Sequence, residues 1–182
     1  MFSEIKVTQM ASYLLSKQDT AMEYIKLLKL LYLAERKAMA KWGDSMSGDH
    51  FVSMPHGPVL SGTYDLIKSN GAEGWNSYIK DEADCMVSLR KKMTSDDLDE
   101  LCPAELKILD NIFLEFGAMP WREIVDYTHN HCREWEDPKG SSYPISNFDI
   151  YLAMDKTANE ANELLARHQE QQNLDYIKMQ LA

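Results

Sequence analysis

The chain has 182 residues, of which 45% are hydrophobic, with a formal net charge of -10 and an estimated pI of 4.9. This length and apolar fraction suffice for one domain with a buried core, and a second domain would be cramped. The acidic balance lacks the general attraction to phosphates that drives nonspecific binding to nucleic acids and anionic membranes. We therefore expect no nucleic acid and no membrane as a partner, and we look for a basic protein surface instead.

The cysteines and the N-terminus predict a reducing, cytoplasmic environment. Cys85, Cys102 and Cys132 form no CxxC pair and leave an odd number, which favours free thiols over a disulfide framework. The first residues lack the basic start and the apolar run of a signal peptide, and no segment approaches the roughly 18 uncharged residues of a membrane span. We expect a soluble, cytoplasmic protein.

The predicted elements are mostly helices, and the second is the most informative. Ser3 can cap a first helix whose apolar residues recur at three- and four-residue steps. Thr20 and Glu23 have the capping-box spacing, which predicts that the second helix starts there, and Gly43 is placed to end it. From Leu27 to Ala34 this second helix is apolar on nearly every side, interrupted by a single lysine. Such a helix cannot lie on a surface, so we predict that it forms the centre of the domain.

The middle of the chain predicts an extended segment and then a third helix. Phe51–Met54 is short and is expected to be extended. Pro58 suits the first turn of a helix that closes near Asn70 and Gly71. The apolar positions of that helix are Val59, Leu60, Tyr64 and Ile67.

Beyond Trp75 the pattern changes to a hairpin and then returns to helices. Tyr78–Ile79 and Cys85–Leu89 are separated by a polar run, which predicts a β-hairpin. A fourth helix is expected from Pro103 to Gly117, and Pro120 is expected to open a fifth. The chain thus predicts a small β-element beside the helices.

The C-terminal part predicts a loop, a long helix and a tail. Glu136–Ser142 has the composition of a loop. Ser146, with Asp149 three residues later, is expected to cap a last helix that runs to about Gln171. Residues 172–182 form a tail or a short amphipathic helix that docks on the body or on a partner through Leu174, Ile177 and Leu181. We therefore predict one mainly α domain, residues 1–171, with about six helices around a buried second helix and a small β-hairpin.

Residues able to carry out chemistry are few. His129, His131 and Cys132 are potential metal ligands, but on a helix the two histidines point about 200° apart, so a packed or capping histidine explains them better than a metal site. His56 precedes Gly57 in a turn that could hold an anion, but a tight turn that seats the third helix against the second explains the same residues better. Cys132 beside a histidine could form a nucleophile, but spacing alone does not establish such a pair. We expect no catalytic residue, no metal and no cofactor.

An acidic run is the candidate surface for partner binding. It consists of Asp96, Asp97, Asp99 and Glu100 and precedes the proline that opens the fourth helix. One interpretation is a solvated loop. The other is a patch that meets a basic surface on a partner protein and accelerates the encounter.

Two motifs resemble those of the Panacea domain, an antitoxin domain family that includes SocA-like proteins. The first is Lys26–Tyr32 in the second helix, and the second is Pro55–Val59 followed by Tyr64, in which His56 stands where a tyrosine is common. Thr128–His129 with Trp135, and Pro144–Ser146, resemble the later half of that domain, so the likeness covers roughly residues 5 to 155. The motif residues expected to form the scaffold are Lys29, Leu30, Leu31, Tyr32, Gly57, Pro58, Val59, Tyr64, His129 and Trp135.

The resemblance implies a mostly helical fold and a noncatalytic, phage- or prophage-associated antitoxin that neutralises a cognate toxin by direct binding. A toxin that acts on tRNA or nucleotides needs a basic surface, which an acidic protein can cover. One alternative is an adaptor that delivers the toxin to a protease. Another is a winged-helix-like DNA-binding regulator that uses the helix after Pro120, although Arg122 and Arg133 are isolated among acidic residues. An enzyme is the last alternative.

Overall fold

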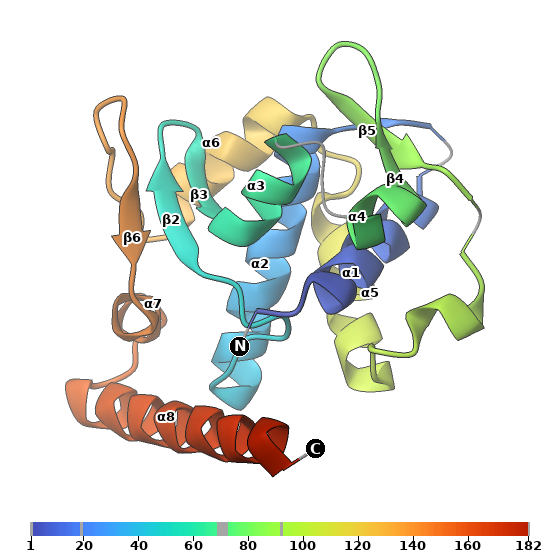
Figure 1. The fold of residues 1–182 in the computed structure, drawn as a ribbon. Coiled ribbons are helices and arrows are strands. Elements are labelled where there is room, and N and C mark those ends of the chain that lie inside the picture. Colours follow the sequence, from blue (N-terminus) through green and yellow to red (C-terminus); the bar gives the residue numbers. More distant parts are fainter. Residues whose placement is uncertain (1, 19, 69–72, 92, 182) are drawn as a thin grey trace.

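The computed structural model describes residues 2–18, 20–68, 73–91 and 93–181. That part of the chain contains eight α-helices and two antiparallel sheets of three strands each (Figure 1). The predicted class, mainly α with a minor β element, is confirmed. There are two helices more than expected, because a short helix precedes the predicted hairpin and the last predicted helix is broken into two.

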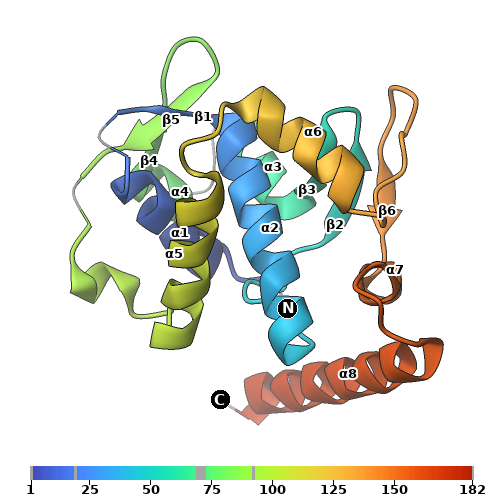
Figure 2. The same cartoon turned by 180° about the vertical axis from the view of Figure 1, so that it is seen from behind.

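Helix α2 (Tyr24–Trp42) is the centre of the fold. Every residue from Leu27 to Ala34 is buried, as its apolar circumference predicts. α2 ends at Gly43, whose φ of 75° is a conformation that glycine adopts without strain. Figures 1 and 2 show other elements on several sides of it. The helices that pack on it include α1 (Glu4–Ser16), α5 (Pro103–Phe116) and α6 (Trp121–His131).

The start of α2 differs from the prediction of a capping box at Thr20 and Glu23. Met22–Glu23 instead form strand β1, which pairs with β5 (Met86–Leu89). Glu23 has an extended backbone and makes no side-chain hydrogen bond to the helix, which begins at Tyr24. The pairing of β1 with β5 replaces the local cap, because hydrogen bonds between these strands satisfy backbone groups next to the helix start.

The predicted helix start at Pro58 is wrong, because Pro58 lies in a strand. β2 (Phe51–Met54) and β3 (Gly57–Leu60) form a hairpin with a two-residue turn. β2 also pairs with β6 (Tyr143–Ile145), so β3 lies at the edge of the sheet. An edge strand tolerates proline, which has no amide hydrogen to donate. The expected tight turn exists, but it joins two strands.

Helix α3 (Ser61–Lys68) starts later than predicted because a distant residue caps it. The Asp49 carboxylate accepts hydrogen bonds of 2.8 Å from the amides of Gly62 and Thr63. The apolar positions 59 and 60 therefore belong to β3 and not to the helix. The predicted helix end at residues 70–71 lies outside the described residues.

The hairpin predicted after Trp75 is confirmed in its strands. β4 (Ile79–Asp81) pairs with β5, and β1 extends this sheet to the order β1-β5-β4. Trp75 itself is buried in a short helix, α4 (Glu73–Tyr78), that packs against α1.

Three predicted helices agree with the structure. Ser3 caps α1 by accepting a hydrogen bond of 3.2 Å from the amide of Lys6. α5 begins at Pro103 and α6 follows Pro120, as expected. The loop Glu136–Ser142 precedes β6, also as expected.

The single helix predicted from Ser146 to about Gln171 is two helices. Ser146 forms the predicted capping box with Asp149 and opens α7 (Asn147–Ala153). The chain turns at a residue of positive φ, Asp155, and then forms α8. The prediction overlooked this break because the apolar spacing continues across it.

Helix α8 (Ala158–Leu181) lies across the C-terminal end of α2 (Figures 1 and 2). Thr157 and Glu160 cap it reciprocally, a pattern that is present in the sequence and was overlooked. α8 is continuous past Gln171, so the predicted helix end is wrong. The predicted boundary between a domain of residues 1–171 and a tail of residues 172–182 stays a prediction. Neither α8 nor any other helix in the described part is long and apolar enough to cross a membrane.

Candidate functional site

Motif residues from α2, the β2–β3 hairpin and α6 meet at one place in the core. We call this place the motif junction and define it by Lys29, Gly57, Pro58, Thr128, His129 and Trp135. The Nζ of Lys29 donates a hydrogen bond of 2.8 Å to the carbonyl oxygen of Pro58, and the lysine is fully buried. Burial lowers the pKa of Lys29 from 10.5 to about 7, because the interior solvates the ammonium form poorly. This lysine ties the central helix to the hairpin.

Gly57 allows the hairpin to approach α2 and α6 closely. Its φ is +89°, and a Cβ built on it would lie 2.7 Å from Thr128 Oγ1, 2.9 Å from Lys29 Nζ and 3.2 Å from His129 Cδ2. Both the backbone conformation and the lack of space therefore require glycine.

The aromatic pair His129 and Trp135 closes the other side of the junction. Their rings stack with centroids 3.9 Å apart, and Trp135 Nε1 donates a hydrogen bond of 2.9 Å to the carbonyl oxygen of Met54. His129 Nε2 is buried and has no hydrogen-bond partner among the described residues. Burial, followed by the nearby charge of Lys29, lowers the pKa of His129. The pair thus fastens the end of α6 to the hairpin turn as a neutral, packed unit.

Tyr32, the last residue of the first motif, joins a buried ionic group. Its hydroxyl donates to Glu134 Oε1 at 2.5 Å, and the same carboxylate accepts from Arg36 Nε at 2.6 Å and from Arg36 Nη2 at 3.2 Å. The Glu134 side chain has no exposed surface. Burial and then the Glu134 charge raise the pKa of Tyr32 well above its ordinary value. The motif therefore connects α2 to the segment that follows α6.

A small cavity of about 90 Å³ lies beside the junction, under the hairpin turn. Tyr64, another motif residue, lines it together with Tyr24. Pockets for drug-sized ligands measure roughly 300 Å³ or more. The lining is largely apolar: Tyr24, Ile25, Leu28, Lys29, Met54, Pro55, His56, Gly57, Val59 and Tyr64. The cavity has room for one side chain and not for a nucleotide.

The residues considered for chemistry are individually buried, stacked or exposed. Cys132 is buried, and burial raises its pKa to about 12, which keeps the thiol protonated. His131 stacks on Tyr127 with centroids 4.2 Å apart, on a different side of α6 from His129. His56 is exposed at the hairpin turn, edge-on to Trp121. Within the described residues no group of three or more His, Cys, Asp or Glu side chains is arranged to hold a metal ion.

The acidic run is divided between structural and free carboxylates. Asp97 accepts hydrogen bonds from the amide and hydroxyl of Thr94, and these contacts, followed by that from Lys91, hold its pKa far below the ordinary value. Asp99 accepts from the side-chain amide of Gln9 at 2.6 Å. Asp96 and Glu100 are exposed, and within the described residues their carboxylates form no bond to another element. Two of the four candidates therefore remain available to a partner.

Two carboxylates that organise the core were not predicted from the sequence. Glu134 is the shared acceptor of Tyr32 and Arg36. Glu35 is fully buried and accepts from the amide of Ser47 at 2.8 Å. The position of Glu35 on the buried second helix could have indicated its burial. A buried carboxylate needs a hydrogen-bonding partner, so such a partner could have been expected.

One comparison with known proteins identifies the family. Searches of curated proteins and of solved structures found no match. The family described as Antitoxin SocA-like, Panacea domain matches residues 27–136, more than half of the chain. The matched segment contains the whole motif junction. The chain belongs to the SocA-like antitoxin family with the Panacea domain.

Proposed function

We propose that this protein neutralises a cognate toxin by binding it directly in a stoichiometric, noncatalytic complex in the cytosol. Membership of the SocA-like antitoxin family carries the proposal. The buried state of Cys132 supports a noncatalytic role, since its thiol has neither the low pKa nor the exposure of a nucleophile.

The charge of the chain supports a basic partner. The net charge is -10, and Asp96 and Glu100 add exposed carboxylates at one segment. Complementary charge accelerates encounter between proteins and disfavours wrong partners. A toxin whose substrate is tRNA or a nucleotide carries the positive surface that such an antitoxin would cover.

Co-expression with the product of the adjacent reading frame tests the proposal. We expect that product to stop growth when made alone and growth to resume when this protein is also made. The Gly57→Ala variant is a useful comparison, because damage to the motif junction should weaken rescue in proportion to loss of folded protein. The proposal fails if no neighbour is toxic, or if toxicity persists at full expression of this protein.

The same cells distinguish neutralisation from delivery to a protease. A pulse-chase experiment should show a toxin lifetime that is unchanged or longer in the presence of this protein. A shorter lifetime would support the adaptor alternative. A DNA-binding role has less support, because α6 packs against β3 and because Arg133 is engaged with Asp155 at 2.5 Å. A band shift at low salt is the measurement that would revive it.

A further inference from the structure

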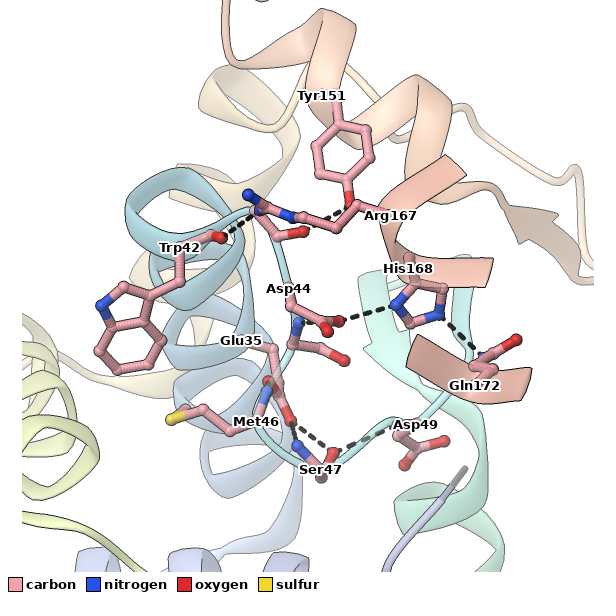
Figure 3. A network of polar contacts seen from close by, with 12 residues as sticks. Glu35, Trp42, Asp44, Met46, Ser47, Asp49, Tyr151, Arg167, His168 and Gln172 are labelled. Carbon is pink, nitrogen blue, oxygen red and sulfur yellow. Dashed lines mark hydrogen bonds and ion pairs between the residues drawn. The ribbon is translucent and has the colours of Figure 1, made fainter. Parts of the chain in front are cut away.

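Helix α8 is attached to the body through its first turns. Ala161 is buried, and His168 Nδ1 lies 2.9 Å from an Asp44 carboxylate oxygen. Arg167 Nη2 donates a hydrogen bond of 2.8 Å to the carbonyl oxygen of Trp42. Figure 3 shows these contacts at the end of α2, together with Gln172, whose side chain meets the other ring nitrogen of His168. Gln172 is the last residue of α8 drawn in this network.

The second half of α8 presents apolar side chains to solvent. Every side chain from Gln171 to Lys178, a segment that we call distal α8, is exposed. Leu174, Tyr176 and Ile177 are 47%, 56% and 53% exposed. Isolated exposed apolar residues are ordinary, but three within four residues of one projecting helix form a patch.

Two of these apolar residues face away from the buried residue Ala161. Counted at about 100° per residue from Ala161, His168 falls about 20° away, whereas Leu174 and Ile177 fall about 140° and 160° away. Leu174 and Ile177 therefore lie opposite Ala161 on one continuous helix, while Tyr176, about 60° from Ala161, is exposed on its flank. Docking on the protein's own body, one of the two possibilities in the sequence, would require α8 to break or to release its anchor.

We infer that distal α8 inserts into an apolar groove with a basic rim on the toxin. This inference rests on the proposed function and names the surface that carries it. Tyr176 lies about 100° around the helix from Ile177, so a groove can cover both whereas a flat surface covers one. Glu163 and Glu170 are exposed on the side of α8 that carries Leu174 and Ile177, which suits a rim of lysine or arginine. Asp175 is paired with Lys178 at 3.8 Å, and Arg167 donates to the Trp42 carbonyl oxygen.

A second copy of this chain is a poorer occupant. Pairing two α8 helices through Leu174 and Ile177 would bury two large side chains per copy, far less than the roughly 1,200 Å² of a stable interface. It would also leave Tyr176 in water. A groove encloses more of the helix and can therefore bury a larger area than a pair of helices.

The family match gives a separate reason to look here. It ends at residue 136, and α8 begins at Ala158. The matched segment includes the motif junction, which holds the core. We therefore expect a contact that is specific to one partner on an element outside the matched segment, such as α8.

The test measures binding of the full chain to the purified toxin found by co-expression. The Leu174→Ala/Ile177→Ala variant keeps the helix, since alanine has the highest helix propensity, and should weaken binding by about 10-fold or more. Leu114→Ala is the matched control, because Leu114 is 84% exposed on α5. Hydrogen exchange on the unaltered protein adds a second readout, in which amides 171–178 should gain protection when toxin binds.

The outcomes separate the two proposals. If the unaltered protein neutralises the toxin but the double variant binds equally well, or amides 171–178 gain no protection, the inference about α8 is overturned and the proposed function stands. If no toxin is neutralised, both are overturned. If the chain alone dimerises and the double variant is monomeric in sedimentation, the patch is a self-interface and the inference is again wrong.

Discussion

Gly57 lies directly against Lys29, so closely that a Cβ at position 57 would be 2.9 Å from the lysine Nζ. The contact places an edge strand against the buried part of the central helix. It leaves the Pro58 carbonyl as the acceptor of the lysine hydrogen bond. The two family motifs are thus one structural unit, in which the second motif supplies the polar partner that the first motif requires.

A substitution at Gly57 should reveal this contact. Gly57→Ala combines an unfavourable left-handed φ, about 1–2 kcal/mol, with steric overlap, about 1–3 kcal/mol. Gly140→Ala is the matched control, since Gly140 has φ +90° and no atom within 4 Å of the added Cβ. Urea unfolding should show a larger loss for Gly57→Ala. Equal losses would mean that the junction relaxes without cost.

Lys29 should make stability depend on pH. Its pKa is about 7 in the folded chain and near 10.5 when unfolded, so between these values the unfolded chain binds more protons and the free energy of unfolding rises with pH. From about pH 7 to pH 9 the native protein should gain about 2 kcal/mol relative to Lys29→Met. Above that range the raised pKa of Cys132, about 12, acts in the opposite direction, because the folded thiol keeps its proton.

Urea unfolding of both proteins at several pH values provides the measurement. Lys37→Met, an exposed lysine of the same helix, is the control and should follow the native protein. Parallel pH curves for the native protein and Lys29→Met would contradict the assignment.

Removing the charge of Glu134 should be strongly destabilising. Glu134→Gln keeps an oxygen for the Tyr32 hydroxyl but leaves the partly buried Arg36 without its counter-charge, which costs about 3 kcal/mol. Asp155→Asn breaks an ion pair whose side chains are largely exposed and should cost less than about 0.5 kcal/mol. The two variants are compared by chemical denaturation. A small loss for Glu134→Gln would show that Arg36 finds solvent instead.

The exposed acidic pair should affect the rate of association more than the lifetime of the complex. Asp96→Asn/Glu100→Gln should slow binding to the toxin by about 3-fold at low salt and reduce its salt dependence. Asp126→Asn/Glu136→Gln removes two exposed charges elsewhere and serves as control. Stopped-flow association at two salt concentrations measures the effect. Identical rates for the two variants would mean that only net charge matters.

The sequence predicted those features that depend on neighbours within a few residues. Ser3, Gly43 and Ser146 mark helix ends through contacts three or four residues away, and each stands where predicted. The apolar circumference of Leu27–Ala34 likewise predicts a buried helix from local spacing alone. The family resemblance was available for the same reason, because its motifs are contiguous.

The sequence could not predict features that depend on distant partners. Met22–Glu23 became a strand because β5 lies beside it, and Pro58 joined β3 because β2 lies beside that strand. Asp49 then determined where α3 begins. In each case, hydrogen bonds with residues remote in the chain outweighed the local preference for a helix.

The sequence alone thus determined the helical class, the buried centre and the family. Only the tertiary structure decided that Lys29 meets Pro58, that Tyr32 meets Glu134 and that α8 leaves Leu174 and Ile177 exposed on the side away from Ala161. The physical reason is that amphipathic spacing and caps are recorded in consecutive residues, whereas the partners of buried charges and the direction of an exposed face are set by chain packing.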